Sequence, residues 1–167
     1  MPVFHHHKCI FVHITKTGGV SIEKTLGLTH DNQKENRECM YGIIQSPELK
    51  RKGLCSPVLQ HLSIMELKEL LGSDIFQNYF KFAIVRNPWD RIVSQFCFNR
   101  KVYVEEDNLS FKDFINNLND FRKRDQLSFI TDHRGDILVD YVGKFESLKK
   151  DFAYISEKIG LEDSSLP

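Results

Sequence analysis

Residues 16–21 (KTGGVS) combine side chains and backbone features that suit the binding of a phosphate-like anion. Two adjacent glycines let the backbone curl so that successive N–H groups point into one concavity, where an anion can sit. Lys16 adds a full positive charge, and the hydroxyls of Thr17 and Ser21 add hydrogen-bond donors. A turn that merely joins two elements needs none of these groups, so we expect an anion site here.

The order of residues in this turn differs from that of a Walker A loop. In G-x-x-x-x-G-K-[ST] the lysine follows the glycines, whereas Lys16 precedes them. This order disfavours an ordinary ATPase or GTPase. A nucleotide or small-molecule kinase stays an alternative because phosphoryl transfer also uses a glycine loop and a lysine. No Walker B aspartate ends an apolar strand in this sequence to hold the magnesium that such an enzyme needs.

A second stretch suited to an anion, residues 86–94 (RNPWDRIVS), follows the apolar run 79–85 (YFKFAIV). Arg86 stands where a strand ends and a helix begins, so its guanidinium can reach an anion at the carboxyl edge of a sheet. Arg91 and Ser94 are three residues apart and share a helix face. From these residues alone, an arginine paired with a carboxylate and a neutral surface serine is an equally good interpretation.

The hydrophobic pattern predicts the elements that position these residues. Apolar runs at 9–14 (CIFVHI) and 79–85 predict buried strands, and 137–145 (ILVDYVGKF) predicts a further strand region. Helical spacing follows the glycine turn and stops at Gly27, and Glu66 completes a capping box for a later helix that ends at Gly72. Ser63 is the cap of that helix, and further helices are expected after caps at Asn87, Ser110 and Ser147, the last of them ending at Gly160.

The alternation of strands and helices predicts an α/β fold with three layers, in which helices flank a mainly parallel sheet. The 167 residues, of which 41% are hydrophobic, suffice for one core, and no linker interrupts them. We therefore expect a single domain over residues 1–167. The polar stretch 29–57 shows no clear period, and a loop of such length in a compact domain often faces a substrate.

Composition excludes several classes of partner. Basic and acidic residues number 23 each, so a global basic field is absent and no nucleic-acid partner is expected. No apolar run is long enough to span a bilayer, and no signal-peptide core opens the chain. Four cysteines without C-x-x-C spacing and three adjacent histidines at 5–7 give no metal site. These features favour a soluble, cytoplasmic protein that needs no metal.

Three segments together resemble carbohydrate-type sulfotransferases. HITKTGGVS resembles the 5′-phosphosulfate loop of that family, usually a Lys-Thr-Gly-Gly-Thr-Ser/Thr run after a strand. R-N-P-x-x-R-x-x-S at 86–94 resembles its 3′-phosphate element, and residues 137–152 resemble its later strand and helix. The resemblance extends from Ile10 to about Leu161 and is weakest between Thr29 and Pro57.

The resemblance implies a nucleotide-fold enzyme, P-loop-like in architecture, that moves a sulfuryl group from 3′-phosphoadenosine 5′-phosphosulfate (PAPS) to an acceptor hydroxyl. The acceptor would be a carbohydrate. Arg86 and Ser94 would bind the 3′-phosphate of the donor. The 5′-phosphate and sulfuryl group would be held by Lys16, Thr17, Gly18, Gly19 and Ser21, with Val20 standing where the family usually has threonine.

Sulfuryl transfer needs a cation at the departing phosphate and a base for the acceptor proton. Lys16 is the expected cation. His61 is the expected base, because His-Leu-Ser before a capped helix resembles the family segment that carries the catalytic histidine. A histidine that merely neighbours the helix start is the alternative. His13, in the first strand, is interpreted as a core histidine, and His30 and His133 are secondary candidates in loops.

Other expectations concern the chain end and the acceptor. The family usually continues past the last helix, so a chain ending at 164–167 (SSLP) is expected to be truncated at its C-terminus. A Golgi-luminal location would apply only to a fragment of an anchored protein. Basic clusters at 50–52 and 122–124 either face an anionic acceptor or are solvated. A nucleotide-binding module that keeps the anion turn without turnover is the alternative outside enzymes.

Overall fold

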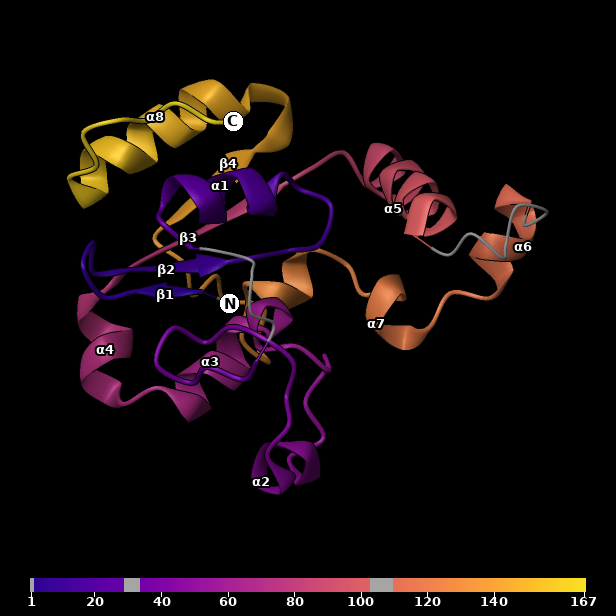
Figure 1. The fold of residues 1–167 in the computed structure, drawn as a ribbon, viewed down its shortest axis with the longest axis horizontal. Helices are drawn as coiled ribbons and strands as arrows, with labels where there is room; N and C mark the ends of the chain where they lie inside the picture. Colours follow the sequence, from indigo (N-terminus) through magenta and orange to yellow (C-terminus); the bar gives the residue numbers. More distant parts are fainter. Residues whose placement is uncertain (1, 29–33, 103–109) are drawn as a thin grey trace.

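A sheet occupies the centre of the computed structural model, which describes residues 2–28, 34–102 and 110–167 (Figure 1). Its strands are β1 (Val3–Phe4), β2 (Cys9–Val12), β3 (Phe80–Val85) and β4 (Tyr141–Lys144). The helices are α1 (Gly19–Thr25), α2 (Pro47–Arg51), α3 (Ile64–Leu70), α4 (Ser73–Asn78), α5 (Pro88–Val102), α6 (Phe111–Asn116), α7 (Asp120–Lys123) and α8 (Leu148–Ile159). Short 3-10 turns are η1 (Leu59–His61), η3 (Leu127–Phe129) and η4 (Phe145–Ser147).

The strands lie in the order β1-β2-β3-β4. Strands β2, β3 and β4 run parallel, with Val12 opposite Ala83 and Phe82 opposite Tyr141. Strand β1 is antiparallel to β2, and its two residues are too few to give a sequence pattern. The expectation of a mainly parallel sheet is confirmed for the described residues. Because β2 and β3 are parallel neighbours, the turns that follow them lie at the same edge of the sheet.

Helices cover both faces of the sheet. On one face, Cys9 and Phe11 belong to a core cluster that includes Ile22 of α1 and Phe152 of α8. On the other face, the alternate residues of β2 pack in a cluster with α3 and α4. Figure 1 shows α1 and α8 above the strands and α3 and α4 below them. The expected α/β class with a helix-flanked sheet is therefore confirmed.

Several predicted boundaries agree with the structure, and others do not. The capping box of Ser63 and Glu66 is present, and Gly160 ends α8 with a left-handed backbone at φ 66°. Only residues 141–144 of the predicted strand region 137–145 are a strand. Helix α3 ends at Leu70, close to the predicted stop at Gly72, but the sequence does not predict α4, which begins directly after that glycine. Helix α4 has six residues, which is too short for a helical period to stand out in the sequence.

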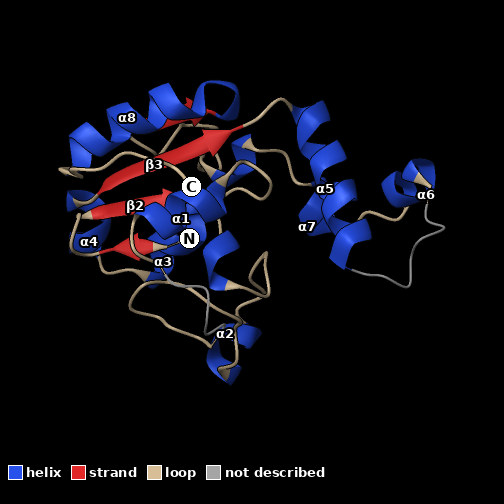
Figure 2. Cartoon of the chain, turned by 45° about the horizontal axis from the view of Figure 1, so that its top comes forward, coloured by secondary structure: helices blue, strands red, loops and turns tan. Residues whose placement is uncertain are grey.

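Helical spacing after Asn87 predicts an apolar face made of Trp89, Ile92, Val93, Phe96 and Cys97, and this prediction is wrong in part. Trp89 is 77% exposed and Val93 is 48% exposed, and Cys97 is also exposed. The reason is visible in Figure 2, where α5 lies beyond the carboxyl end of β3 rather than across a face of the sheet. The Asn87 cap itself is confirmed, because its Oδ1 accepts a hydrogen bond from the Trp89 N–H at 2.9 Å.

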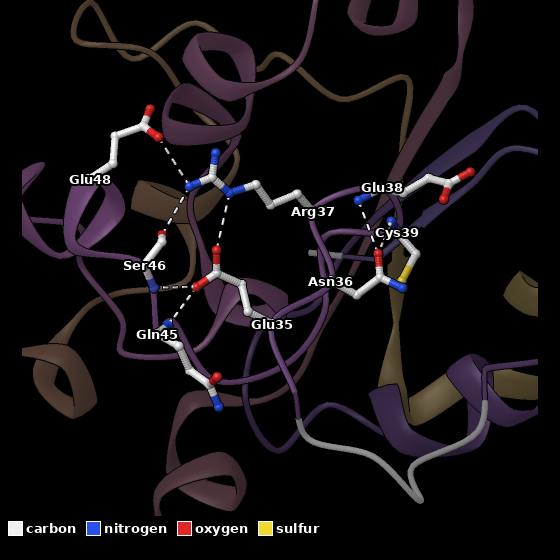
Figure 3. A network of polar contacts seen from close by, with 8 residues as sticks. All are labelled: Glu35, Asn36, Arg37, Glu38, Cys39, Gln45, Ser46 and Glu48. Atoms are coloured by element: carbon white, nitrogen blue, oxygen red, sulfur yellow. Dashed lines mark hydrogen bonds and ion pairs between the residues drawn. The ribbon is translucent and has the colours of Figure 1, made fainter.

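The long polar connection after α1 is held by a network around Glu35 (Figure 3). The Glu35 carboxylate accepts hydrogen bonds from the backbone N–H groups of Gln45 and Ser46, at 2.5 and 2.7 Å. Arg37 donates to Glu35 at 3.0 Å and to Glu48 at 3.1 Å. Burial alone would raise the pKa of Glu35, but these hydrogen bonds outweigh it and lower the pKa to about 2.

Replacing Glu35 with glutamine should make stability less dependent on acid pH. The folded-state pKa of Glu35 lies below its ordinary value of 4.5, so its contribution is fully present above pH 4.5. That contribution is lost as the pH falls through about 2. Urea unfolding of the wild type and of Glu35→Gln should therefore show a stability difference that shrinks over this range. The exposed Glu38→Gln variant is the control, and a difference independent of pH would contradict the assignment.

Candidate functional site

The glycine turn lies between β2 and α1, at the carboxyl edge of the sheet. Gly18 has φ 83°, and a Cβ there would lie 3.1 Å from the Leu148 side chain and 3.2 Å from the Phe145 ring. Both the backbone conformation and the lack of space therefore require glycine at position 18. Lys16 also has a left-handed backbone, with φ 66°. Such a conformation is uncommon for a long side chain and is concentrated at ligand-binding turns.

The Lys16 ammonium group is held against an aromatic ring. Its Nζ lies 4.2 Å from the centre of the Phe98 ring on α5, a distance suited to a cation–π contact. Burial, and then the charge of Arg86, lower the pKa of Lys16. Both causes disfavour the charged form of the lysine. An anion bound beside Lys16 would relieve them because it supplies a countercharge.

Arg86 connects the turn after β3 with the turn after β2. Its Nη1 donates a hydrogen bond to the Lys16 carbonyl at 3.3 Å, and its guanidinium lies 4.2 Å from the centre of the Phe145 ring. Gln126 fixes the Arg86 backbone, because it donates to the carbonyl at 2.7 Å and accepts from the N–H at 2.9 Å. The Arg86 Nε is buried and has no hydrogen-bond partner among the described residues.

Arg91 and Ser94 both lie on α5, but their side chains are in different environments. Ser94 faces the same cavity as Lys16 and Arg86. Arg91 instead donates to the Thr15 hydroxyl at 3.4 Å and to the Arg124 carbonyl at 3.0 Å. Burial is the main cause that lowers the pKa of Arg91. Arg91 therefore fastens α5 to the residue that precedes the turn.

A cavity of about 380 Å³ joins these groups, a volume within the usual range of ligand pockets. Its walls include the two expected cations, Lys16 and Arg86, and most of the other site residues predicted from the sequence. The residues that line it are His13, Thr15, Lys16, Gly18, Gly19, Val20, Ser21, His61, Arg86, Ser94, Gln95, Phe98 and Phe145.

Thr17 differs from the other residues of the turn. Its side chain is fully buried, and its hydroxyl donates a hydrogen bond to the Ile14 carbonyl at 2.8 Å. The hydroxyl therefore stabilises the turn from inside, and the structure does not support its expected role as a donor to an anion. Ser21 lies on the cavity wall, and its N–H donates to the Gly18 carbonyl at 3.2 Å.

His61 reaches the cavity from η1. Its Nδ1 lies 3.0 Å from the His13 carbonyl oxygen. A carbonyl can only accept a hydrogen bond, so the neutral His61 ring carries its proton on Nδ1 and has its lone pair on Nε2. Burial, followed by the neighbouring His13, lowers the pKa of His61 to about 3. His61 is consequently neutral at physiological pH.

The chain matches a known protein family over its whole length. The model of the sulfotransferase family matches residues 1–167. The chain belongs to the sulfotransferase family. It is also 31% identical over 101 residues to an uncharacterized protein of Archaeoglobus fulgidus, an alignment that covers 58% of this chain and 81% of that protein. No solved structure matches the chain.

The loop candidate His133 of this sulfotransferase family member lies away from the cavity. His133 is exposed and lines a different hollow, beside Cys55 and Glu66. His30 lies outside the described residues. Within the described ranges, no group of three His, Cys, Asp or Glu side chains is arranged to hold a metal ion. The helices of the same ranges include none with the length and apolar character needed to cross a membrane.

Sequence reasoning missed several residues of the cavity. Phe98 stands four residues after Ser94, so helical spacing could have placed it on the same wall. His13 is buried as expected for a core histidine, but it also lines the cavity. Its partner is Glu23 on α1, whose Oε1 lies 2.5 Å from the His13 Nδ1. Nothing in the local sequence signals this contact, because ten residues and a tight turn separate the two.

Proposed function

We propose that this sulfotransferase family member transfers a sulfuryl group from PAPS to an acceptor hydroxyl, and that the acceptor is a carbohydrate. The observation that carries the proposal is the shared cavity, whose walls include Lys16, Arg86, Ser94 and His61. Its composition supplies cations for phosphate groups, a hydroxyl donor and a neutral imidazole. The carbohydrate class rests on the resemblance of the motifs at 16–21 and 86–94 to carbohydrate-type enzymes.

In this proposal, one donor nucleotide spans both turns. Residues 16–21 hold the 5′-phosphate and the sulfuryl group through backbone N–H groups and the Lys16 ammonium. Arg86 and Ser94 hold the 3′-phosphate, with the buried Arg86 Nε as an available donor. The 3.3 Å contact between Arg86 and the Lys16 carbonyl supports this assignment, because it brings the two turns within reach of one molecule.

The reaction that follows is an in-line displacement at sulfur. The acceptor oxygen attacks the sulfur atom, and the bond from sulfur to the bridging phosphate oxygen breaks. The acceptor proton passes to His61 Nε2, the ring nitrogen that carries the lone pair. Lys16 stabilises the negative charge that develops on the departing phosphate. The negative charge of the bound donor raises the low pKa of His61, which strengthens it as a base.

A nucleotide titration tests the proposal against its rivals. Calorimetry should show that adenosine 3′,5′-bisphosphate binds without metal and more tightly than ATP with magnesium. A preference for ATP with magnesium would contradict the proposal and favour a kinase. Labelled PAPS should then transfer its sulfuryl group to members of a glycan panel. Tight binding of the bisphosphate without transfer to any glycan or small alcohol would point instead to a nucleotide-binding module.

A further inference from the structure

His13 and Glu23 form a buried polar pair that joins the end of β2 to α1. The exposed fractions of their side chains are 7% and 1%, and the His13 Nδ1 lies 2.5 Å from the Glu23 Oε1. The His13 ring also stacks on Phe11, with 5.4 Å between ring centres. Burying a pair of this kind carries a desolvation penalty, and apolar residues of similar size are often at least as stable. The stability of the core therefore does not explain why these two polar residues are buried together.

The His13 ring lies between the phosphate turn and His61. A Cβ built on Gly19 would lie 2.1 Å from His13 Nε2, so the ring closely approaches the backbone of the turn. On its other side, the ring contacts the His61 ring edge to face, with 4.6 Å between centres and 71° between planes. The His13 carbonyl accepts the hydrogen bond from His61 Nδ1 at 3.0 Å. One residue thus touches both the turn and the expected base.

We propose that the His13–Glu23 pair is a positioning device that orients His61 and fixes its tautomer. Glu23 locks the His13 ring, and the locked ring and its carbonyl hold the His61 ring so that Nε2 is the atom offered to a substrate. The close approach to Gly19 sets the spacing between that atom and the phosphate turn. His13 and Glu23 act through His61. Only the effect of the pair on turnover rests on the proposed sulfuryl transfer.

Nitrogen NMR of the imidazole rings tests the geometric part without any assay of activity. In the ¹⁵N-labelled wild type between pH 6 and 8, His61 should show a protonated Nδ1 and an unprotonated Nε2, with the signals assigned by comparison with His61→Gln. The Glu23→Ala variant should show a mixture of both tautomers, because a His13 residue released from Glu23 no longer holds its carbonyl against His61 Nδ1. A protonated Nε2 in the wild type would overturn the proposal, and so would an unchanged single tautomer in a folded Glu23→Ala variant.

Kinetics test the consequence for the reaction. Glu23→Ala should lower kcat about 10- to 100-fold, the usual effect of losing a partner that orients a functional histidine. Affinity for adenosine 3′,5′-bisphosphate should change less than about threefold, because Glu23 is not one of the residues that line the cavity. Glu23→Gln should recover most of the lost rate, since its Oε1 can still accept from His13 Nδ1.

The control is Glu157→Gln, which changes an exposed glutamate on α8 and should leave the rate unaltered. Equal rates in the wild type and Glu23→Ala would overturn the positioning role, and so would failure of Glu23→Gln to recover more than Glu23→Ala. If the wild type transfers no sulfuryl group, the proposed function fails. The wild-type NMR spectrum still tests the geometry independently of activity and of whether the Glu23 variants fold, because an unprotonated His61 Nδ1 would overturn the proposal.

Discussion

Replacing His61 with alanine should lower kcat for sulfuryl transfer about 10²–10⁴-fold, the usual contribution of a positioned general base. His61 lines the cavity and has its lone pair on Nε2, and alanine leaves no group there to take the acceptor proton. Binding of adenosine 3′,5′-bisphosphate should stay nearly intact, because His61 is not among the residues assigned to either phosphate. Steady-state rates with labelled PAPS and calorimetry with the bisphosphate measure the two effects separately.

His133→Ala is the matched control for this variant. His133 is exposed and lies by a different hollow, so its loss should leave both the rate and the affinity unchanged. A rate for His61→Ala equal to that of the wild type would remove His61 from the role of base. Equal losses of rate in both histidine variants would also contradict the assignment, because they would indicate a general effect on the fold.

Replacing Lys16 with alanine should weaken donor binding and turnover together. A hydrogen bond to a charged group contributes about 1.5–3 kcal/mol, so the Kd for adenosine 3′,5′-bisphosphate should rise about 10- to 100-fold. The value of kcat should fall about 10²–10³-fold, because the lysine also stabilises charge that develops on the leaving phosphate. Calorimetry and initial-rate measurements at saturating PAPS provide the two values.

Lys24→Ala serves as the control for Lys16→Ala. Lys24 is an exposed lysine on α1, in the helix that follows the same turn. Its removal changes the net charge by the same amount but should alter neither affinity nor rate. Normal kinetics for Lys16→Ala, or matching effects in both lysine variants, would be incompatible with a specific role of Lys16 at the donor.

Local signals explain what the sequence predicted well. The capping box at Ser63 and the glycine turn between β2 and α1 depend on residues close together in the chain, and both are present. That the turns after β2 and β3 share one edge follows from parallel pairing, since the carboxyl ends of parallel strands meet there. Parallel pairing of the two predicted strands therefore predicts that Arg86 and Lys16 lie near one another.

Features that depend on three-dimensional packing could not be predicted from local sequence signals. The burial of the Thr17 hydroxyl depends on how tightly the turn curls back to Ile14. Exposure of Trp89 depends on α5 lying past the end of the sheet, which the helical period cannot reveal. The contact between His13 and Glu23 needs the strand and helix to be brought together first. In each case, the three-dimensional packing decides the outcome, and the hydrophobic period of the sequence does not report it.

The most direct test of the account is a crystal structure with bound adenosine 3′,5′-bisphosphate. The account predicts the 5′-phosphate on the backbone of residues 16–21 beside Lys16, and the 3′-phosphate on Arg86 and Ser94. A nucleotide bound elsewhere, or with its phosphates away from both turns, would contradict it.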